Sequence, residues 1–153
     1  MTGNGKRSAT AQKPAAEVRL LGRVSLADCL ALQNRLMFEA GGQVEPRIVV
    51  LFCEHPVSLT VGRSGSRAHI RFSDAQLRHD HIRVRWVSRG GPCVLHGPGQ
   101  LAVYPIVPLE QVGWSVGEYL RRFQSALVRA FAQVGVPGET RPGSFGVRGR
   151  SGL

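Results

Sequence analysis

Residues 47–53 (RIVVLFC) constrain the fold of this chain more than any other segment. They form a continuous apolar run rich in β-branched side chains, far shorter than the roughly 20 residues that a membrane span needs. A run of this kind predicts a strand that is buried on both faces. The chain has 153 residues, which is long enough for one domain with a sizeable core around that strand.

Further strands are predicted on both sides of this run. Residues 17–23 are predicted to form a first strand, and residues 82–87 have the apolar alternation of a half-buried strand. Residues 101–107 contain Pro105, which indicates an edge strand or a bulge because proline has no N–H to donate to a ladder. No element is predicted after Gly135, where the chain becomes rich in glycine and proline.

Serine residues mark the starts of the predicted helices. Ser25 with Asp28, and Ser115 with Glu118, match the capping-box pattern, in which the serine oxygen accepts from the backbone N–H three residues later. The helix after Ser115 is the clearest, because apolar residues follow at spacings of three and four. A short helix is predicted after Ser73. Strands and helices mixed in this way predict an α/β (α+β) domain with a mixed sheet flanked by helices.

The net charge of +10 comes mostly from arginine, since Lys6 and Lys13 are the only lysines. A basic surface attracts acidic partners, which include nucleic acid, anionic lipid and acidic carrier proteins. The sequence contains no RNA-binding aromatic signature and no zinc-finger spacing, so nucleic-acid binding is not expected.

The N-terminal residues and the cysteines bear on location. Residues 1–16 are polar and lack the apolar core of a secretory signal, and they are predicted to form a flexible tail. Their basic, acid-poor composition weakly resembles a transit peptide. The cysteines, Cys29, Cys53 and Cys93, are odd in number and widely spaced, which argues against a disulfide framework and favours the cytoplasm.

The glycine-rich segment 89–100 (RGGPCVLHGPGQ) is the strongest candidate for a functional site. Glycines allow close approach of a ligand to the backbone, and the segment also holds Arg89 and His96. A cation, exposed N–H groups and an imidazole together could bind an anionic group or a polarised carbonyl. An equally supported interpretation is a glycine-rich hairpin in which His96 only satisfies backbone carbonyls.

Two motifs carry a family resemblance. Residues 89–106 (RGGPCVLHGPGQLAVYPI) resemble the signature RGGxxTxHGPGQ of lipoyl(octanoyl) transferases. Upstream, residues 54–63 (EHPVSLTVGR), which leave the central strand through a proline loop, resemble that family's EHPxxxTxGR segment. The resemblance covers roughly residues 17–153. It implies the α/β catalytic domain that this family shares with biotin protein ligases and lipoate ligases, preceded by the tail at 1–16.

The resemblance also implies an activity. Such enzymes transfer an octanoyl group from acyl carrier protein to a lysine of a lipoyl domain, through a thioester on an enzyme cysteine beside a lysine. No cofactor or metal is expected, because the substrate arrives as an activated thioester. The expected partners are octanoyl-acyl carrier protein and the lipoyl domains of 2-oxoacid dehydrogenase complexes or glycine cleavage H protein, with no membrane. The residues that would line the acyl pocket are Arg89, Gly90, Gly91, Pro92, Cys93, Val94, Leu95 and His96.

The sequence departs from the family pattern in two ways. Val94 replaces the family threonine and so lacks a hydroxyl, and Leu95 replaces an aromatic residue. The family's catalytic lysine and cysteine lie beyond the segment that matches RPGxxGV, and thus beyond Leu153. We therefore expect a C-terminally incomplete catalytic domain without turnover.

Alternatives remain open at this point. One is a non-catalytic module that binds acyl groups or carrier protein, or a decayed paralogue. Cys93 could replace the missing nucleophile, but on a strand it would face away from His96, so a buried apolar role is expected instead. His79 and His81 supply only two metal ligands and are expected in a solvated turn. An ATP-dependent lipoate ligase is disfavoured, because the sequence HGPGQ is the form of this loop that the transferases have.

Overall fold

The computed structural model describes residues 15–149. The chain divides into two compact units, one ending at Val107 and the other beginning at Pro108. Strands and helices alternate along it, which confirms the predicted α/β class. Within the described residues, no helix has both the length and the apolar character needed to cross a membrane.

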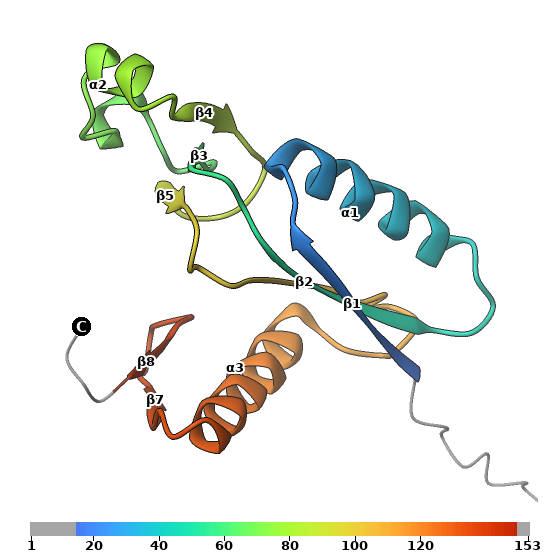
Figure 1. Cartoon of the computed structure of the whole chain (residues 1–153). Coiled ribbons are helices and arrows are strands. Elements are labelled where there is room, and N and C mark those ends of the chain that lie inside the picture. The colour runs from blue at the N-terminus through green and yellow to red at the C-terminus, as the bar shows by residue number, and fades with distance from the viewer. Residues whose placement is uncertain (1–14, 150–153) are drawn as a thin grey trace, which may run out of the picture. The chain divides into compact units, whose positions relative to one another are not determined.

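The first unit begins with a parallel strand pair joined through a helix. β1 (Ala15–Arg23) and β2 (Arg47–Glu54) are parallel, and α1 (Leu26–Gly41) makes the crossover that a parallel pair requires. β6 (Ala102–Ile106) pairs with the other side of β2 in the antiparallel direction, giving the order β1-β2-β6. Pro105 therefore lies on an edge strand, as predicted. Figure 1 shows β2 crossing the centre of this sheet.

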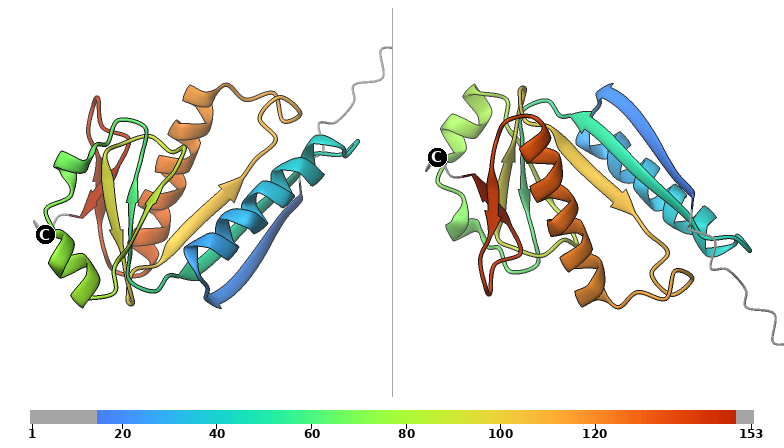
Figure 2. Two further views of the ribbon diagram at one scale, coloured as in Figure 1. Left: turned by 90° about the horizontal axis from the view of Figure 1, so that it is seen from above. Right: turned by 90° about the horizontal axis from the view of Figure 1, so that it is seen from below.

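β2 is the centre of the first core, but its two faces are not equally buried. Val49, Leu51 and Cys53 are buried on the face that α1 covers, where Leu36 packs against the sheet. Figure 2 shows α1 lying along this face. The alternate residues between them are only half-buried. The prediction of full burial on both faces was therefore wrong, because within the first unit α1 covers one face only.

The capping residue of α1 is the predicted one. The Ser25 hydroxyl accepts from the backbone N–H of Asp28 at 3.1 Å and donates to its carboxylate at 2.6 Å. Gly42 forms the C-cap. β1 starts at Ala15, two residues earlier than predicted, and the rest of the predicted tail, residues 1–14, lies outside the described residues.

A second mixed sheet completes the first unit. β3 (Ser58–Val61) pairs in parallel with β4 (Arg83–Trp86) and antiparallel with β5 (Cys93–His96), in the order β4-β3-β5. The sequence predicted one mixed sheet, with a loop where β3 lies. The polar and apolar residues of β3 alternate, but the strand has only four residues, and Pro56 just before it favours a loop in a local interpretation.

The segment between β3 and β4 covers the apolar face of this sheet. It contains a 3₁₀ turn, η1 (Arg67–His69), and the predicted short helix, α2 (Asp74–His79). Its apolar side chains pack against Leu59 and Val61. The chief members of this layer are Ile70, Phe72, Leu77 and Ile82.

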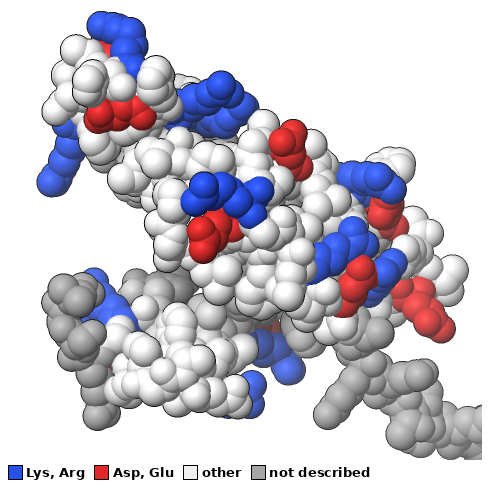
Figure 3. Space-filling model, in the orientation of Figure 1, with Lys and Arg blue, Asp and Glu red and all other residues white. Residues whose placement is uncertain are grey.

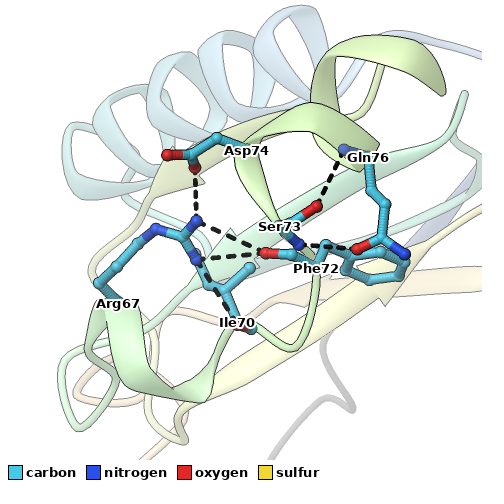
Figure 4. Close-up of polar contacts among 6 residues, drawn as sticks. All are labelled: Arg67, Ile70, Phe72, Ser73, Asp74 and Gln76. Carbon is cyan, nitrogen blue, oxygen red and sulfur yellow. Dashed lines mark hydrogen bonds and ion pairs between the residues drawn. The ribbon is translucent and has the colours of Figure 1, made fainter.

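Polar contacts fix the entry to α2 (Figure 4). The Ser73 hydroxyl accepts from the N–H of Gln76 at 3.2 Å, and the Gln76 side chain accepts from the N–H of Ser73 at 2.8 Å. The guanidinium of Arg67 pairs with Asp74 and also reaches the carbonyl of Phe72. These contacts hold the apolar layer against β3.

The second unit consists of a helix and a hairpin. α3 (Val116–Gln133) starts at the predicted cap, where the Ser115 hydroxyl accepts from the N–H of Glu118 at 3.1 Å. β7 (Gly138–Thr140) and β8 (Val147–Gly149) form an antiparallel pair in the region predicted to lack elements. A Cβ at Gly138 would lie 2.7 Å from a methyl group of Val147, so the close pairing requires glycine there. The single domain expected over residues 17–153 stays a prediction.

The first core gives a direct stability test. Leu51 is fully buried, so Leu51→Ala should lower the free energy of unfolding by roughly 2–5 kcal/mol, the usual cost of such a cavity. Val44 is fully exposed, and Val44→Ala should change it by less than about 0.5 kcal/mol. Urea denaturation measures both variants. Equal, small effects would show that β2 is not the centre of the core.

Candidate functional site

The two motifs of the sequence lie opposite each other. β2 pairs with β6 and β3 pairs with β5, both antiparallel, so the connector at 55–57 faces the connector at 97–101. The carboxylate of Glu54 accepts from the N–H of Gly99 at 3.2 Å, which joins the two connectors directly. The rings of His55 and His96 meet edge to face, with centroids 5.5 Å apart.

Thr60 is the polar centre of this arrangement. Its side chain is only 2% exposed, and it lies in β3 directly opposite Val94 of β5. The hydroxyl oxygen lies 3.3 Å from the carbonyl oxygen of Val94 and 3.3 Å from Nε2 of His96. The guanidinium of Arg89 donates to the same hydroxyl at 2.8 Å and to the Thr60 carbonyl at 2.9 Å. One hydroxyl thus links both motifs.

The hydrogen bonds of Arg89 fix the loop before β5 against β3. Besides its bonds to Thr60, Arg89 donates from Nη1 to the carbonyl of Gly90 at 2.7 Å. Arg89 has no carboxylate partner among residues 15–149, so its positive charge is not neutralised there. The free cation expected from the sequence is therefore a half-buried arginine that fixes the loop before β5.

The loop between Arg89 and β5 packs tightly on the end of β3. The N–H of Gly62 donates to the Pro92 carbonyl at 2.7 Å, and the N–H of Arg63 donates to the Arg89 carbonyl at 3.0 Å. A Cβ at Gly62 would lie 2.3 Å from the Gly91 carbonyl oxygen, which no side chain could accommodate. Gly91 has φ of +78°, a conformation that favours glycine. The glycines thus shape the loop.

The environment of His96 favours its neutral form. Burial lowers the pKa of His96 from its ordinary value of 6.5, and the nearby His55 and the positive charge of Arg89 lower it further. A neutral imidazole at this place can accept or donate a hydrogen bond without bringing a charge into the site.

A cluster of hydrogen-bonding groups on the buried side of His55 fixes the orientation of its ring. Its Nδ1 lies 2.8 Å from the carbonyl of Val24, which can only accept, so Nδ1 carries the proton. Its Nε2 lies 2.9 Å from the hydroxyl of Tyr104 and 3.6 Å from the sulfur of Cys53. Burial raises the pKa of Tyr104 to about 12, so the phenol keeps its proton.

The same cluster is the group within residues 15–149 that could hold a metal. The ligand atoms of Cys29, Cys53 and His55 all lie within 4.8 Å of one another. Burial raises the pKa of the Cys53 thiol to about 12, and the neighbouring Cys29 raises it further. A metal needs a thiolate, which this environment disfavours. Cys29 and Cys53 are therefore packed core residues, as the sequence predicted.

β5 divides the predicted acyl-pocket residues between its two faces. Val94 and His96 share the face of Thr60, on which Arg89 also lies. Cys93 and Leu95 alternate to the other face, where Cys93 packs on the apolar layer beneath β3. The loop before β5 contains the remaining three, Gly90, Gly91 and Pro92. The sequence did not single out Thr60 or Tyr104; the threonine of the EHPxxxTxGR pattern was the available signal for Thr60.

The arrangement is suited to a polarised carbonyl. The backbone N–H groups of Gly90 and Gly91 have no acceptor among the described residues, and they lie beside the charge of Arg89. Such donors can stabilise a carbonyl oxygen that gains negative charge.

His79 and His81 are not part of this site. Both are exposed at the C-terminal end of α2, as expected for a solvated turn.

Comparison with known proteins identifies the family. The family model described as "Lipoyl protein ligase A/B catalytic domain" matches residues 25–153. The chain is 34% identical over 130 residues to an octanoyltransferase of Porphyromonas gingivalis, covering 82% of this chain and 26% of that protein. It is 35% identical over 136 residues to an octanoyltransferase of Chloroflexus aurantiacus, covering 88% and 60%.

A vertebrate relative is also similar. The chain is 37% identical over 132 residues to the mitochondrial octanoyl-(acyl-carrier-protein):protein N-octanoyltransferase of Xenopus tropicalis, covering 84% of this chain and 55% of that protein. The chain thus spans between about a quarter and three fifths of the length of these relatives. It belongs to the lipoyl protein ligase A/B catalytic domain family.

Solved structures show the same fold. LipL1 of P. falciparum in complex with lipoate matches with a TM-score of 0.66 at 12% identity, covering 90% of this chain and 41% of that one. A bipartite lipoate protein ligase of Thermoplasma acidophilum matches with a TM-score of 0.60 at 15% identity, covering 85% and 49%. These likenesses confirm the predicted fold of lipoate ligases.

The pKa of His96 tests the geometry around Thr60. An NMR titration should place the His96 midpoint below 6.5, because burial, His55 and Arg89 all disfavour the imidazolium. The unfolded chain takes up this proton at higher pH than the folded one, so the contribution of His96 to stability is lost as pH falls from 6.5 through the folded pKa. Arg89→Gln should raise the midpoint, whereas Arg78→Gln on exposed α2 should leave it unchanged. Equal shifts in both variants would contradict the arrangement.

Proposed function

We propose that this chain forms the acyl-binding part of an octanoyl-acyl-carrier-protein:protein N-octanoyltransferase. The observation that carries the proposal is the hub at Thr60, which joins Arg89 and His96 beside two unpaired glycine N–H groups. The names of the relatives support the substrate class, because each is an octanoyltransferase. Members of the same fold bind lipoate, an acyl group of similar length.

Each group at the site then has a role toward an octanoyl thioester. The N–H groups of Gly90 and Gly91 donate hydrogen bonds to the thioester carbonyl oxygen, and the charge of Arg89 stabilises that oxygen as it becomes more negative. Val94 offers an apolar surface to the acyl chain, in place of the hydroxyl of the family threonine. No cofactor is required, because the thioester is already activated.

The proposed partners are acidic proteins that fit a basic chain. Octanoyl-acyl carrier protein would deliver the acyl group, and lipoyl domains of 2-oxoacid dehydrogenase complexes or glycine cleavage H protein would accept it. The net charge of +10 favours encounter with such partners. On the face drawn in Figure 3, arginines are interspersed with acidic residues, so the attraction is distributed over the surface. We propose the cytoplasm as the location, because the three cysteines are free thiols and the cytoplasm is a reducing compartment.

A second candidate function, binding without transfer, is favoured by the absence of the family's catalytic pair from these residues. The only lysines are Lys6 and Lys13, ahead of the described residues. Cys93 packs on the apolar layer, away from His96. The raised pKa of Cys53 removes that thiol as a nucleophile. We therefore propose that these residues on their own hold the acyl group and do not transfer it.

Binding and transfer can be measured separately on the whole chain. Calorimetry with S-octanoyl-pantetheine should show saturable binding, which Arg89→Gln weakens about tenfold or more because a charged donor is lost. Arg78→Gln removes the same charge from exposed α2 and should not change the affinity. Mass spectrometry after incubation with octanoyl-acyl carrier protein and a lipoyl domain should show no octanoyl-lysine and no acyl group on Cys93.

Each result has a distinct consequence. No saturable binding of the octanoyl thioester would sink the proposed function. Octanoyl transfer to the lipoyl domain would refute binding without transfer, and loss of that transfer in Cys93→Ala would make Cys93 the nucleophile. Binding that Arg89→Gln and Arg78→Gln weaken equally would place the acyl group away from the Thr60 hub.

A further inference from the structure

A cavity of about 420 Å³ lies in the first unit, where the first turn of α1 approaches β3 and β4. It is built from other residues than the Thr60 hub, and β4 lies on the opposite side of β3 from β5. The residues used below that line it are Leu26, Ala27, Ser58, Arg83 and Arg85. Pro56, Val57 and Ser58 of the motif at 54–63 line part of this cavity, whereas Arg83 and Arg85 of β4 lie outside both motifs and were not predicted as site residues.

Ser58 lines this cavity, and its hydroxyl is buried and unpaired. The residue is 7% exposed, and its Oγ has no hydrogen-bond partner among residues 15–149. Buried hydroxyls are almost always bonded, so an unpaired one calls for an explanation such as a missing ligand. Because Ser58 lies directly beside Arg83 in the parallel pairing of β3 and β4, the two side chains share a face of the sheet.

The two arginines of β4 are unpaired as well. Arg83 and Arg85 are two residues apart on one strand, so their side chains point to the same face. Neither side chain has an ion pair or a hydrogen bond to any residue between 15 and 149. Two like charges held side by side repel each other, and an anion between them removes that cost.

The first turn of α1 adds donors on the other side of the cavity. The N–H groups of Leu26 and Ala27 have no carbonyl four residues earlier within the helix, and the positive end of the helix dipole lies there. Asp28 is the acidic residue of this turn, and it does not line the cavity. Its carboxylate accepts instead from the hydroxyl of Ser25.

We propose that this cavity binds a phosphate group of a small organic molecule. The residues that line it carry two guanidinium groups, two backbone N–H groups of a first helical turn and one hydroxyl, and this donor set suits the several oxygens of a phosphate. The volume leaves room for an organic group attached to the phosphate. The phosphate could belong to a free metabolite or to the pantetheine arm of a carrier protein, and the second source rests on the proposed function.

Calorimetry on the whole chain at about 0.15 M salt, where long-range attraction is screened, tests this site. Inorganic phosphate and pantetheine 4′-phosphate should each bind with a stoichiometry of one, and pantetheine without phosphate should not compete. Arg83→Gln and Arg85→Gln should each weaken phosphate binding about tenfold, since each removes charged donors. Ser58→Ala should weaken it several-fold, with circular dichroism confirming that the variant is folded.

Arg78→Gln is the matched control, because it removes the same charge from exposed α2, outside the cavity. Its phosphate affinity should equal that of the unaltered chain. An equal loss in Arg78→Gln would mean general attraction to a basic protein and would overturn the proposal. So would the absence of saturable phosphate binding.

The two proposals can fail independently. S-octanoyl-pantetheine carries no phosphate, so its binding reports on the Thr60 hub alone. Phosphate binding without octanoyl binding would support the cavity as a site for a free phosphorylated molecule and reject the proposed function. Binding of pantetheine 4′-phosphate at least tenfold tighter than inorganic phosphate would support the carrier arm as the source. Equal affinities would support a free phosphate compound.

Discussion

The arrangement of the first unit depends on one buried hydroxyl. Thr60 lies in β3, and its Oγ1 contacts the guanidinium of Arg89, the ring of His96 and the carbonyl of Val94. An unpaired hydroxyl at this depth would cost about 1–3 kcal/mol, so the bonds that satisfy it also fix the relative position of the two strands. The glycine-rich loop keeps its shape because Arg89 is held there.

This constraint explains why the site lies where the chain crosses between the two sheets. The chain passes from β2 to β3 and returns from β5 to β6, so both connectors meet at the same place. Glu54 ends β2, His55 begins the first connector, and Gly99 lies in the second. A site built from connectors would be mobile if they were free. Here Thr60, the cluster around His55 and the close approach of Gly62 hold both in position.

Sequence patterns predicted the elements that have strong local signals. α1 and α3 begin at the predicted serine caps, and β2 follows the longest apolar run. β3 was missed because its four residues depend on strands that pair with it from distant parts of the chain. For the same reason, no local pattern could indicate that Arg89 donates hydrogen bonds to Thr60. The alternation of β5 was foreseen for Cys93 and His96, and the register confirms it.

In the proposed function, an octanoyl thioester binds against the loop that Arg89 fixes. An NMR titration of the isotope-labelled chain with S-octanoyl-pantetheine tests this binding mode. The amide signals of Gly90 and Gly91 should shift most, in a saturable way, and the acyl chain should show contacts to the methyl groups of Val94. Unshifted glycine amides, with the acyl chain in contact with other residues, would contradict it.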